Sequence, residues 1–244
     1  MSALEAGPTP VVGSGAVVEA RNGALRARGL TKSYRDGARE VVVLRDVDLD
    51  LASGALAAIV GPSGSGKTTL LHLLGALDTP DRGTVEVGGI DLSTLDGARL
   101  ARFRNKNLGF VFQFHQLLPD FTALENVMMP ARIAGRPARE ALDRARSLLA
   151  EVGLEDRATH FPNQLSGGEQ QRVAICRPLA LEPSLLLADE PTGNLDPATG
   201  RRVLDLMIEL QTRRGMTGVL VTHNPEVANR CASIWRLEEG LLLP

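Results

Sequence analysis

The sequence GPSGSGKT, at residues 61–68, lies between an apolar run, ALAAIV at 55–60, and a segment with helical spacing, TTLLHLLGAL at 68–77. It matches the pattern GxxxxGK[ST], in which glycines let the backbone turn so that its N–H groups point inward. These groups and the positive end of the following helix form a cradle for phosphate oxygens. Only three of the 27 basic residues are lysines, so Lys67 indicates a need for a compact positive charge on the outer phosphates. We therefore predict a strand, a phosphate-binding loop and a helix, with the Thr68 hydroxyl offered to magnesium.

The remaining chain alternates between strand and helix patterns. Val47, Leu49 and Leu51 alternate with aspartates, which is typical of a half-buried strand. Further strand patterns are a short hairpin GTVEVGG at 83–89, LGFVF at 108–112, LLLA at 185–188 and TGVLVT at 217–222. Between the last two, Asp196 is placed to cap a helix that has proline at its first position. Such alternation predicts an α/β fold with a mostly parallel sheet covered on both faces.

One internal segment has a different pattern. Residues 114–164 show helical spacing and no convincing strand, and we interpret them as an inserted helical lobe. The flanking segments, 23–113 and 165–244, form the predicted nucleotide-binding core. Residues 1–22 are small and rich in Gly and Pro, without the basic and continuous apolar regions of a secretory signal, and we predict a disordered tail.

Composition argues against several classes of protein. The chain of 244 residues has 27 basic and 29 acidic residues, a balance that gives no electrostatic footprint for a nucleic-acid partner. Its longest purely apolar run, at 55–60, is far shorter than the roughly 20 residues of a membrane helix, so we expect no membrane span. Cys176 and Cys231 lie far apart without metal-ligand spacing, and we expect two small buried side chains in a reducing compartment.

Two adjacent acids, Asp189 and Glu190, end the apolar run LLLADE at 185–190. Burying carboxylates is costly unless a cation or water meets them. Because successive side chains of a strand point to opposite sides, the two acids can address different species. On this interpretation Asp189 acts on magnesium and Glu190 polarises the attacking water. An acid pair alone could equally be a solvated strand end, and the phosphate-binding loop favours the catalytic interpretation.

A second glycine-rich turn, LSGGEQ at 165–170, enters a helix and by itself would be a weak anion-site candidate. In combination with the other motifs, it makes the chain resemble the ABC ATPases over about residues 24–240, since LSGGEQ is that family's signature. The resemblance implies a P-loop NTPase fold, with a RecA-like parallel-sheet core, an N-terminal antiparallel β subdomain and the inserted helical lobe. It also implies a head-to-tail homodimer in which each ATP lies between the phosphate loop of one copy and LSGGEQ of the other.

The resemblance assigns roles to individual residues. Gln113 matches the family's Q-loop glutamine, His223 its switch histidine, and Tyr34 the aromatic residue that stacks on adenine. Asn194, Leu195 and Asp196 look like the D-loop. The implied catalytic residues are Lys67, Gln113, Glu190 and His223, and the implied magnesium ligands are Thr68, Gln113 and Asp189. The implied ATP contacts are Tyr34, Gly61, Pro62, Ser63, Gly64, Ser65, Gly66, Lys67, Thr68, Thr69, Ser166, Gly167, Gly168, Glu169 and Asp196.

One position departs from the family pattern. Pro178 stands in the helix after the signature, where relatives usually have alanine. An interior proline removes a hydrogen bond and clashes with the preceding turn, at a cost of about 3 kcal/mol. We therefore expect a kink or lowered stability there.

The branch of the family is indicated by NKNLGFVFQFHQLLPDFTALENVMMP at 105–130 together with DEPTGNLD at 189–196. Both stretches are similar to the branch that holds lipoprotein-releasing, MacB-type efflux and FtsE-like cell-division ATPases, and most similar to the lipoprotein-releasing members. This implies a peripheral subunit on the cytoplasmic face of a bacterial inner membrane, bound to integral permease subunits. The alternatives are efflux, mechanotransmission, or a soluble ABC ATPase outside transport.

The apolar residues between Phe114 and Met129 leave two interpretations open. They form either the core of the helical lobe or a groove that receives a cytoplasmic helix of the membrane partner, for which soft methionine side chains are suited.

Overall fold

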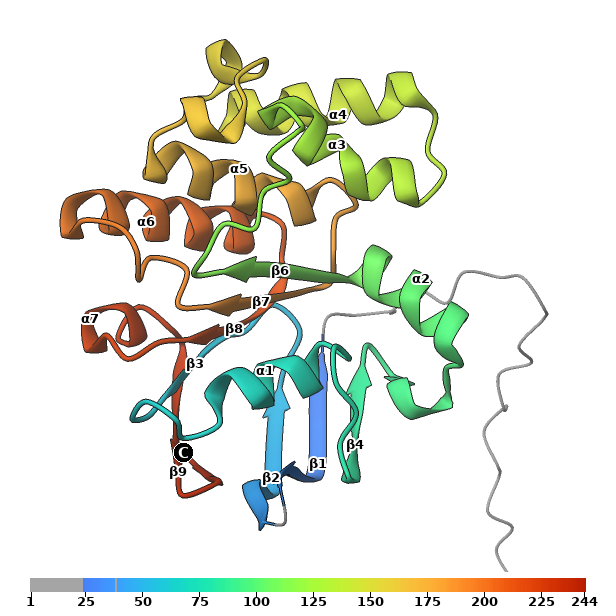
Figure 1. Cartoon of the computed structure of the whole chain (residues 1–244), viewed down its shortest axis with the longest axis vertical. Helices are drawn as coiled ribbons and strands as arrows, with labels where there is room; N and C mark the ends of the chain where they lie inside the picture. The colour runs from blue at the N-terminus through green and yellow to red at the C-terminus, as the bar shows by residue number, and fades with distance from the viewer. Residues whose placement is uncertain (1–23, 38) are drawn as a thin grey trace, which may run out of the picture.

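The computed structural model describes residues 24–37 and 39–244, so the predicted tail at 1–22 lies outside the described part (Figure 1). An antiparallel sheet has the strand order β2-β1-β4-β5, and a six-stranded sheet has the order β10-β9-β3-β8-β7-β6. The strands of the first sheet are β1 (Leu25–Asp36), β2 (Arg39–Leu51), β4 (Arg82–Val87) and β5 (Ile90–Asp91). Those of the second are β3 (Leu56–Val60), β6 (Leu108–Phe112), β7 (Leu185–Asp189), β8 (Thr217–Val221), β9 (Ser233–Glu238) and β10 (Leu241–Leu243).

The pairing directions confirm the predicted fold class. Neighbours from β9 to β6 pair in parallel, and β10 pairs antiparallel with β9 at the edge. The smaller sheet is antiparallel and N-terminal, as the family resemblance implied. A parallel-sheet core with an antiparallel β subdomain is therefore the architecture of the described chain.

The predicted strands differ from the observed ones mainly in length. LGFVF is β6 residue for residue, and the hairpin predicted at 83–89 is β4 and β5 joined at Gly88 and Gly89. The alternating aspartate segment is only the end of the much longer β2. The sequence did not predict β1, because register shifts between Ala27 and Leu30 interrupt its alternation of buried and exposed residues. It also did not predict β9 and β10.

Helices cover both faces of the parallel sheet. Figure 1 shows α1 (Lys67–Leu74) between the two sheets, and α5 (Gly167–Leu179) and α6 (Pro197–Arg213) on the opposite face of the larger sheet. Leu185 and Leu187 of β7 face the core shared with α1, while Leu186 between them packs in the second core with the helices. Successive strand residues thus enter different cores, as the two-sided burial of a parallel sheet requires.

Two more helices lie within residues 114–164, α3 (Ala123–Ile133) and α4 (Ala138–Glu151). Short 3₁₀ turns occur at Leu92–Thr94, Glu155–Arg157 and Pro162–Gln164, and the remaining helices are α2 (Gly97–Asn107) and α7 (Pro225–Ala228). The structure has no strand within 114–164, which agrees with the helical pattern. Because α3 packs on both α4 and α5, the helical layer extends beyond the predicted bounds of the lobe, which remain a prediction.

Pro178 is the penultimate residue of α5. Because a proline disturbs the turn that precedes it, any distortion falls on the last turns of α5, and the expected kink or lowered stability stays a prediction. Its ring packs against β6, where a Cβ added to Gly109 would lie 3.0 Å from the Pro178 Cβ.

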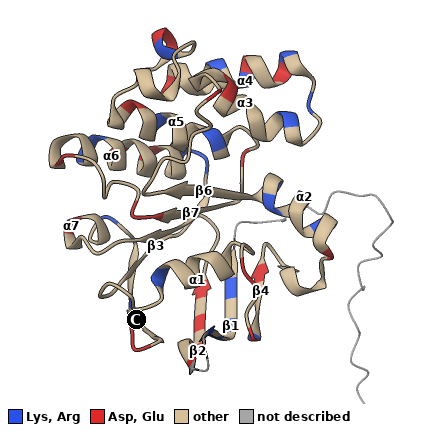
Figure 2. Cartoon of the chain, in the orientation of Figure 1, with Lys and Arg blue, Asp and Glu red and all other residues tan. Residues whose placement is uncertain are grey.

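Two expectations from composition have different outcomes. Cys176 is fully buried, but Cys231, in the turn after α7, is only partly buried, so the prediction of a buried side chain is wrong for Cys231. Within residues 24–37 and 39–244, no helix combines the length and the apolar character needed to cross a bilayer. Lys and Arg are interspersed with Asp and Glu along the helices (Figure 2).

Candidate active site

A cavity of about 510 Å³ lies at the carboxyl ends of the parallel strands. Parallel strands bring their carboxyl ends to one edge, where ligands bind in open α/β sheets. The antiparallel sheet contributes one further wall through Tyr34 of β1 and Val43 of β2. The cavity is lined by Tyr34, Val43, Ser63, Gly64, Gly66, Lys67, Thr68, Thr69, Gln113, Asp189, Glu190 and His223.

The glycine-rich loop joins β3 to α1 and surrounds the Lys67 side chain. The Nζ atom of Lys67 donates hydrogen bonds to the carbonyl oxygens of Gly61 (2.9 Å) and Pro62 (2.8 Å). Gly66 has a φ of 99°, and a Cβ there would lie 2.8 Å from a methyl carbon of Val43, so only glycine fits. Because Gly66 offers no side-chain cap to α1, the first N–H groups of that helix are suited to bind an anion.

Two oxygen-bearing side chains that could bind a divalent cation, Thr68 and Asp189, are adjacent in this cavity. The Thr68 hydroxyl donates to Asp189 Oδ2 at 2.8 Å. Burial raises the pKa of Asp189, the Thr68 hydrogen bond lowers it, and the charge of Glu190 raises it further, so the net pKa is raised. The described residues contain no cluster of three or more acidic, His or Cys ligands. Mg²⁺ is usually held by one or two carboxylates together with substrate phosphates, so the Thr68–Asp189 pair fits that ion.

Glu190 and His223 form a second pair of interacting polar side chains in the cavity. Glu190 Oε1 lies 2.7 Å from His223 Nδ1 and accepts the backbone N–H of His223 at 2.8 Å. The backbone of Glu190 is in the left-handed region, with a φ of 46°, which is costly for a residue with a Cβ. This turn directs its carboxylate along the cavity wall, while Asp189 addresses Thr68. The two neighbouring acids therefore have different partners, but the turn at Glu190, beyond the end of β7, separates them and not alternation along the strand; their predicted roles toward magnesium and water stay predictions.

Gln113 connects the helical layer to the loop that precedes α6. Its amide nitrogen donates to Asn194 Oδ1 at 3.0 Å, and its backbone carbonyl accepts from Asn194 Nδ2 at 3.1 Å. A Cβ on Gly193 would lie 2.9 Å from the same Gln113 nitrogen. Gln113 lines the cavity, but its side chain is hydrogen-bonded to Asn194 and not to Thr68 or Asp189.

Tyr34 stands at the cavity wall and is held by residues that the sequence motifs did not identify. Its hydroxyl donates to Asp78 Oδ2 at 2.8 Å, and Asp78 Oδ1 accepts from Lys32 Nζ at 2.9 Å. Sequence separation hides this group, because Asp78 lies 44 residues after Tyr34. The rarity of lysine in the composition was the one signal in the sequence that pointed to Lys32.

The LSGGEQ residues do not reach the cavity of their own chain. Ser166 caps α5, and its hydroxyl and backbone N–H both donate to Glu169 Oε2, at 2.7 and 2.8 Å. These hydrogen bonds and the Arg157 ion pair outweigh burial and lower the pKa of Glu169 to about 2. A Cβ added to Gly168 would lie 2.6 Å from Thr199 of α6, so close packing requires glycine.

The other predicted contacts are placed as follows. Asp196 caps α6, as predicted, through the N–H groups of Ala198 and Thr199, both at 3.1 Å. It lines a second cavity of about 370 Å³ that Glu190 and His223 also line. Gly61, Pro62 and Ser65 belong to the phosphate loop but do not line the cavity that holds Lys67 and Asp189, and Ser65 lines a neighbouring one.

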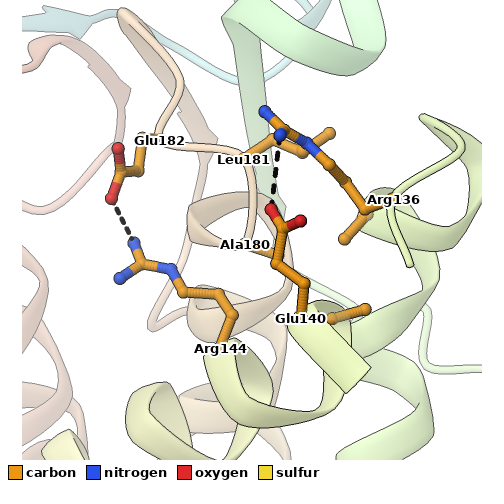
Figure 3. Close-up of a pocket in the computed structure, with 8 residues that line it drawn as sticks. Arg136, Glu140, Arg144, Ala180, Leu181 and Glu182 are labelled. Carbon is orange, nitrogen blue, oxygen red and sulfur yellow. Dashed lines mark ion pairs between the residues drawn. The ribbon is translucent and has the colours of Figure 1, made fainter. Parts of the chain in front are cut away.

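A smaller cavity of about 200 Å³ lies between α4 and the segment after α5 (Figure 3). Its two arginines are paired with glutamates, Arg136 with Glu140 at 3.3 Å and Arg144 with Glu182 at 3.0 Å. Because both charges are already balanced, this cavity offers no counterpart to the phosphate-binding loop.

The fold and the site define a P-loop nucleotide-binding cassette. The model of the ABC transporter family matches residues 44–193, and this chain belongs to that family of ATP-hydrolysing subunits. It is 51% identical to the lipoprotein-releasing system ATP-binding protein LolD of Syntrophus aciditrophicus, over 88% of this chain and 97% of the relative. LolD of Geobacter metallireducens is 54% identical over 88% of this chain and 96% of its own. LolD of Legionella pneumophila (strain Paris) is 51% identical over 89% and 96%.

A solved structure agrees with the sequence comparison. The ATP-binding cassette MJ0796, dimeric and bound to ADP and Pi in a post-hydrolysis state, is 41% identical with a TM-score of 0.82. The match covers 89% of this chain and 96% of that chain. The predicted family is thus confirmed, and so is the predicted resemblance to its lipoprotein-releasing branch.

Proposed function

We propose that this chain is the Mg²⁺-dependent, ATP-hydrolysing subunit of a membrane complex that releases lipoproteins from the bacterial inner membrane. The observation that carries the proposal is the identity of about half of all residues with LolD proteins across nearly the full length of both chains. The cavity supports the chemistry, because a phosphate loop, an acidic strand end and a histidine converge there.

In the proposed mechanism, the backbone N–H groups of the loop and Lys67 bind the ATP phosphates, and Tyr34 stacks on the base. Glu190 accepts the proton of the attacking water, and His223, 2.7 Å from the Glu190 carboxylate, holds that carboxylate in place. Thr68, Asp189 and Gln113 would hold Mg²⁺, which when bound supplies positive charge to the outer phosphates.

A second copy of the chain is proposed to complete each site. Ser166 and the N–H groups of Gly167 and Gly168 lie at the start of α5, outside the cavity of their own chain. The solved relative MJ0796 is described as dimeric. A head-to-tail homodimer would place this helix start against the phosphates held by the partner copy, where its dipole favours negative charge.

We place the complex on the cytoplasmic face of the inner membrane, with integral permease subunits docked at the segment after Gln113. Phe114 is 70% exposed, and Leu118 and Phe121 are also exposed, whereas Leu117 and Met128 pack against the core of the helical layer. The segment therefore offers exposed apolar side chains for a partner to contact, while its other apolar side chains attach it to the core. Closure of the dimer on ATP would move Gln113 and the helices α3 and α4, and the docked partner segment would follow.

The experiment is to purify the protein from gently solubilised membranes, identify its partners, and deplete it in cells. We expect integral membrane partners and lipoproteins retained in the inner membrane. A Lys67→Ala protein expressed during depletion is the matched control, since it keeps the docking surface but lacks the phosphate-binding charge, and it should not rescue release. Recovery with an efflux partner and undisturbed lipoprotein sorting would contradict the proposal while leaving the ATPase assignment intact.

A further inference from the structure

The segment that follows α1 is fastened to the strand that carries Tyr34. Asp78 accepts hydrogen bonds from Tyr34 and Lys32, and Lys32 Nζ also donates to the carbonyl oxygen of Thr79 at 2.7 Å. Asp81 accepts the backbone N–H and the hydroxyl of Ser33, at 2.7 and 2.8 Å. Three consecutive residues of β1 are therefore tied to residues 78–81.

This connection links the two ends of the nucleotide cavity. The helix α1 begins at Lys67, beside the phosphate loop, and ends at Leu74, four residues before Asp78. Figure 1 shows α1 between the two sheets. The phosphate loop lies at one end of α1 and Asp78 lies after the other end. Because the helix between them is rigid, the contacts of Asp78 with Tyr34 and Lys32 set the distance between the Tyr34 ring and the phosphate loop. Without them the ring, 43% exposed on a β-strand, would have more rotamers available.

Lys32 is buried and makes several specific contacts. It is only 8% exposed, and it is one of three lysines in an arginine-rich chain. Burial lowers the pKa of Lys32, but the hydrogen bond and charge of Asp78 more than offset this and leave the pKa raised, so the ammonium stays charged. Its Nζ lies over the Tyr34 ring, 5.1 Å from the centroid, a cation–π distance. Tyr34 lines the cavity, whereas Lys32 and Asp78 do not.

We propose that Lys32 and Asp78 are positioning residues for nucleotide binding, which hold the Tyr34 ring at a fixed distance from the phosphate loop so that it stacks on the purine base of ATP. The proposal rests on the stacking role given to Tyr34 under the proposed function. It extends the site to two residues that contact neither phosphate nor base.

The test compares the Kd of ATP with that of inorganic triphosphate, which lacks the base, by calorimetry on the purified chain. Replacing both members of the pair, Lys32→Met with Asp78→Leu, leaves no unpaired buried charge. We expect ATP affinity to fall about 5- to 50-fold, within the range of a lost base stack, while triphosphate affinity changes less than about 2-fold. In a Tyr34→Ala background the pair variant should cause no further loss of ATP affinity.

A single substitution keeps the test informative if the pair variant folds poorly, and a second ion pair serves as the control. Tyr34→Phe keeps the ring and the Lys32–Asp78 ion pair and removes only the hydroxyl, so ATP affinity should fall about 2- to 5-fold with triphosphate affinity unchanged. The matched control is Arg136→Met with Glu140→Leu, an exposed ion pair between the loop before α4 and the first turn of α4 (Figure 3), which should change neither affinity.

Each result separates the positioning role of the pair from the stacking role of Tyr34. Equal losses for ATP and triphosphate would mean a general structural role and would overturn the positioning proposal. Unchanged ATP affinity in both the pair variant and Tyr34→Phe, with a large loss in Tyr34→Ala, would also overturn it but leave the stacking role. Unchanged ATP affinity in Tyr34→Ala would remove the stacking role itself, and the positioning proposal with it.

Discussion

Replacing Glu190 with glutamine is the sharpest test of the catalytic assignment. Glutamine keeps a carbonyl oxygen that can accept the His223 backbone N–H, which now binds Oε1 at 2.8 Å. It cannot accept a proton from water, and its amide lacks the charge that faces His223 Nδ1 at 2.7 Å. A positioned general base contributes about 10²- to 10⁴-fold, so turnover should fall by that factor, or about 3 to 5 kcal/mol in activation free energy.

The assay is ATP turnover under saturating nucleotide, with ATP binding and oligomeric state measured in parallel. The phosphate loop is untouched, so Glu190→Gln should bind ATP normally and accumulate an ATP-bound dimer. Glu209→Gln is the matched control, because Glu209 is an exposed glutamate on α6 that pairs with Arg213 at 3.6 Å. Turnover equal to that of the wild type in Glu190→Gln would refute the assignment, and so would a loss of ATP binding large enough to explain the slower rate.

Three further predictions concern the site and its surroundings. Mixing Lys67→Ala with Ser166→Ala subunits should restore one composite site per heterodimer, so ATPase activity should exceed that of either variant alone; confirmed heterodimers without such a gain would contradict the shared site. Phe114→Glu should weaken co-purification of the membrane partner without lowering the thermal midpoint, because that ring is 70% exposed, whereas Met128→Glu should lower the midpoint because Met128 packs against the core. The pKa of Glu169 is lowered to about 2, so its stabilising effect is present above its ordinary value and is lost as pH falls. The difference in unfolding free energy between wild type and Glu169→Gln, measured by denaturant titration, should therefore shrink as pH falls from about 5 towards about 2, and a constant difference would contradict this reasoning.

Local patterns in the sequence identified most of the parallel sheet. Strands β3, β6, β7 and β8 are short, apolar and bounded by turn residues, so each could be located within about one residue from its own pattern. The strands β9 and β10, at one edge of the sheet, were harder to locate from the sequence. They follow a short helix at the C-terminal end, where Ile234 and Leu241 are exposed and Trp235 is only partly buried, so no clean alternation marks them.

Some site residues could likewise be identified from local sequence patterns, and others could not. The loop residues, the adjacent acids and the signature occupy contiguous motifs, and their chemistry could be predicted from those motifs taken together. Lys32 and Asp78 are 46 residues apart and belong to no shared motif, so their pairing depends on how β1 packs beside the segment after α1. The same holds for Gln113 and Asn194, which are 81 residues apart.

The sequence by itself predicted which groups would bind phosphate, coordinate magnesium and activate water, because a glycine loop, a lysine and a strand-end carboxylate act through their own chemistry and their immediate neighbours. The tertiary structure alone decided which of these groups meet. It brings the loop, Asp189, Glu190 and His223 to one sheet edge, leaves Ser166 outside the cavity of its own chain, and ties Tyr34 to Asp78. Such contacts form between residues far apart in the chain, and their geometry is set by the packing of whole strands and helices, which no local pattern encodes.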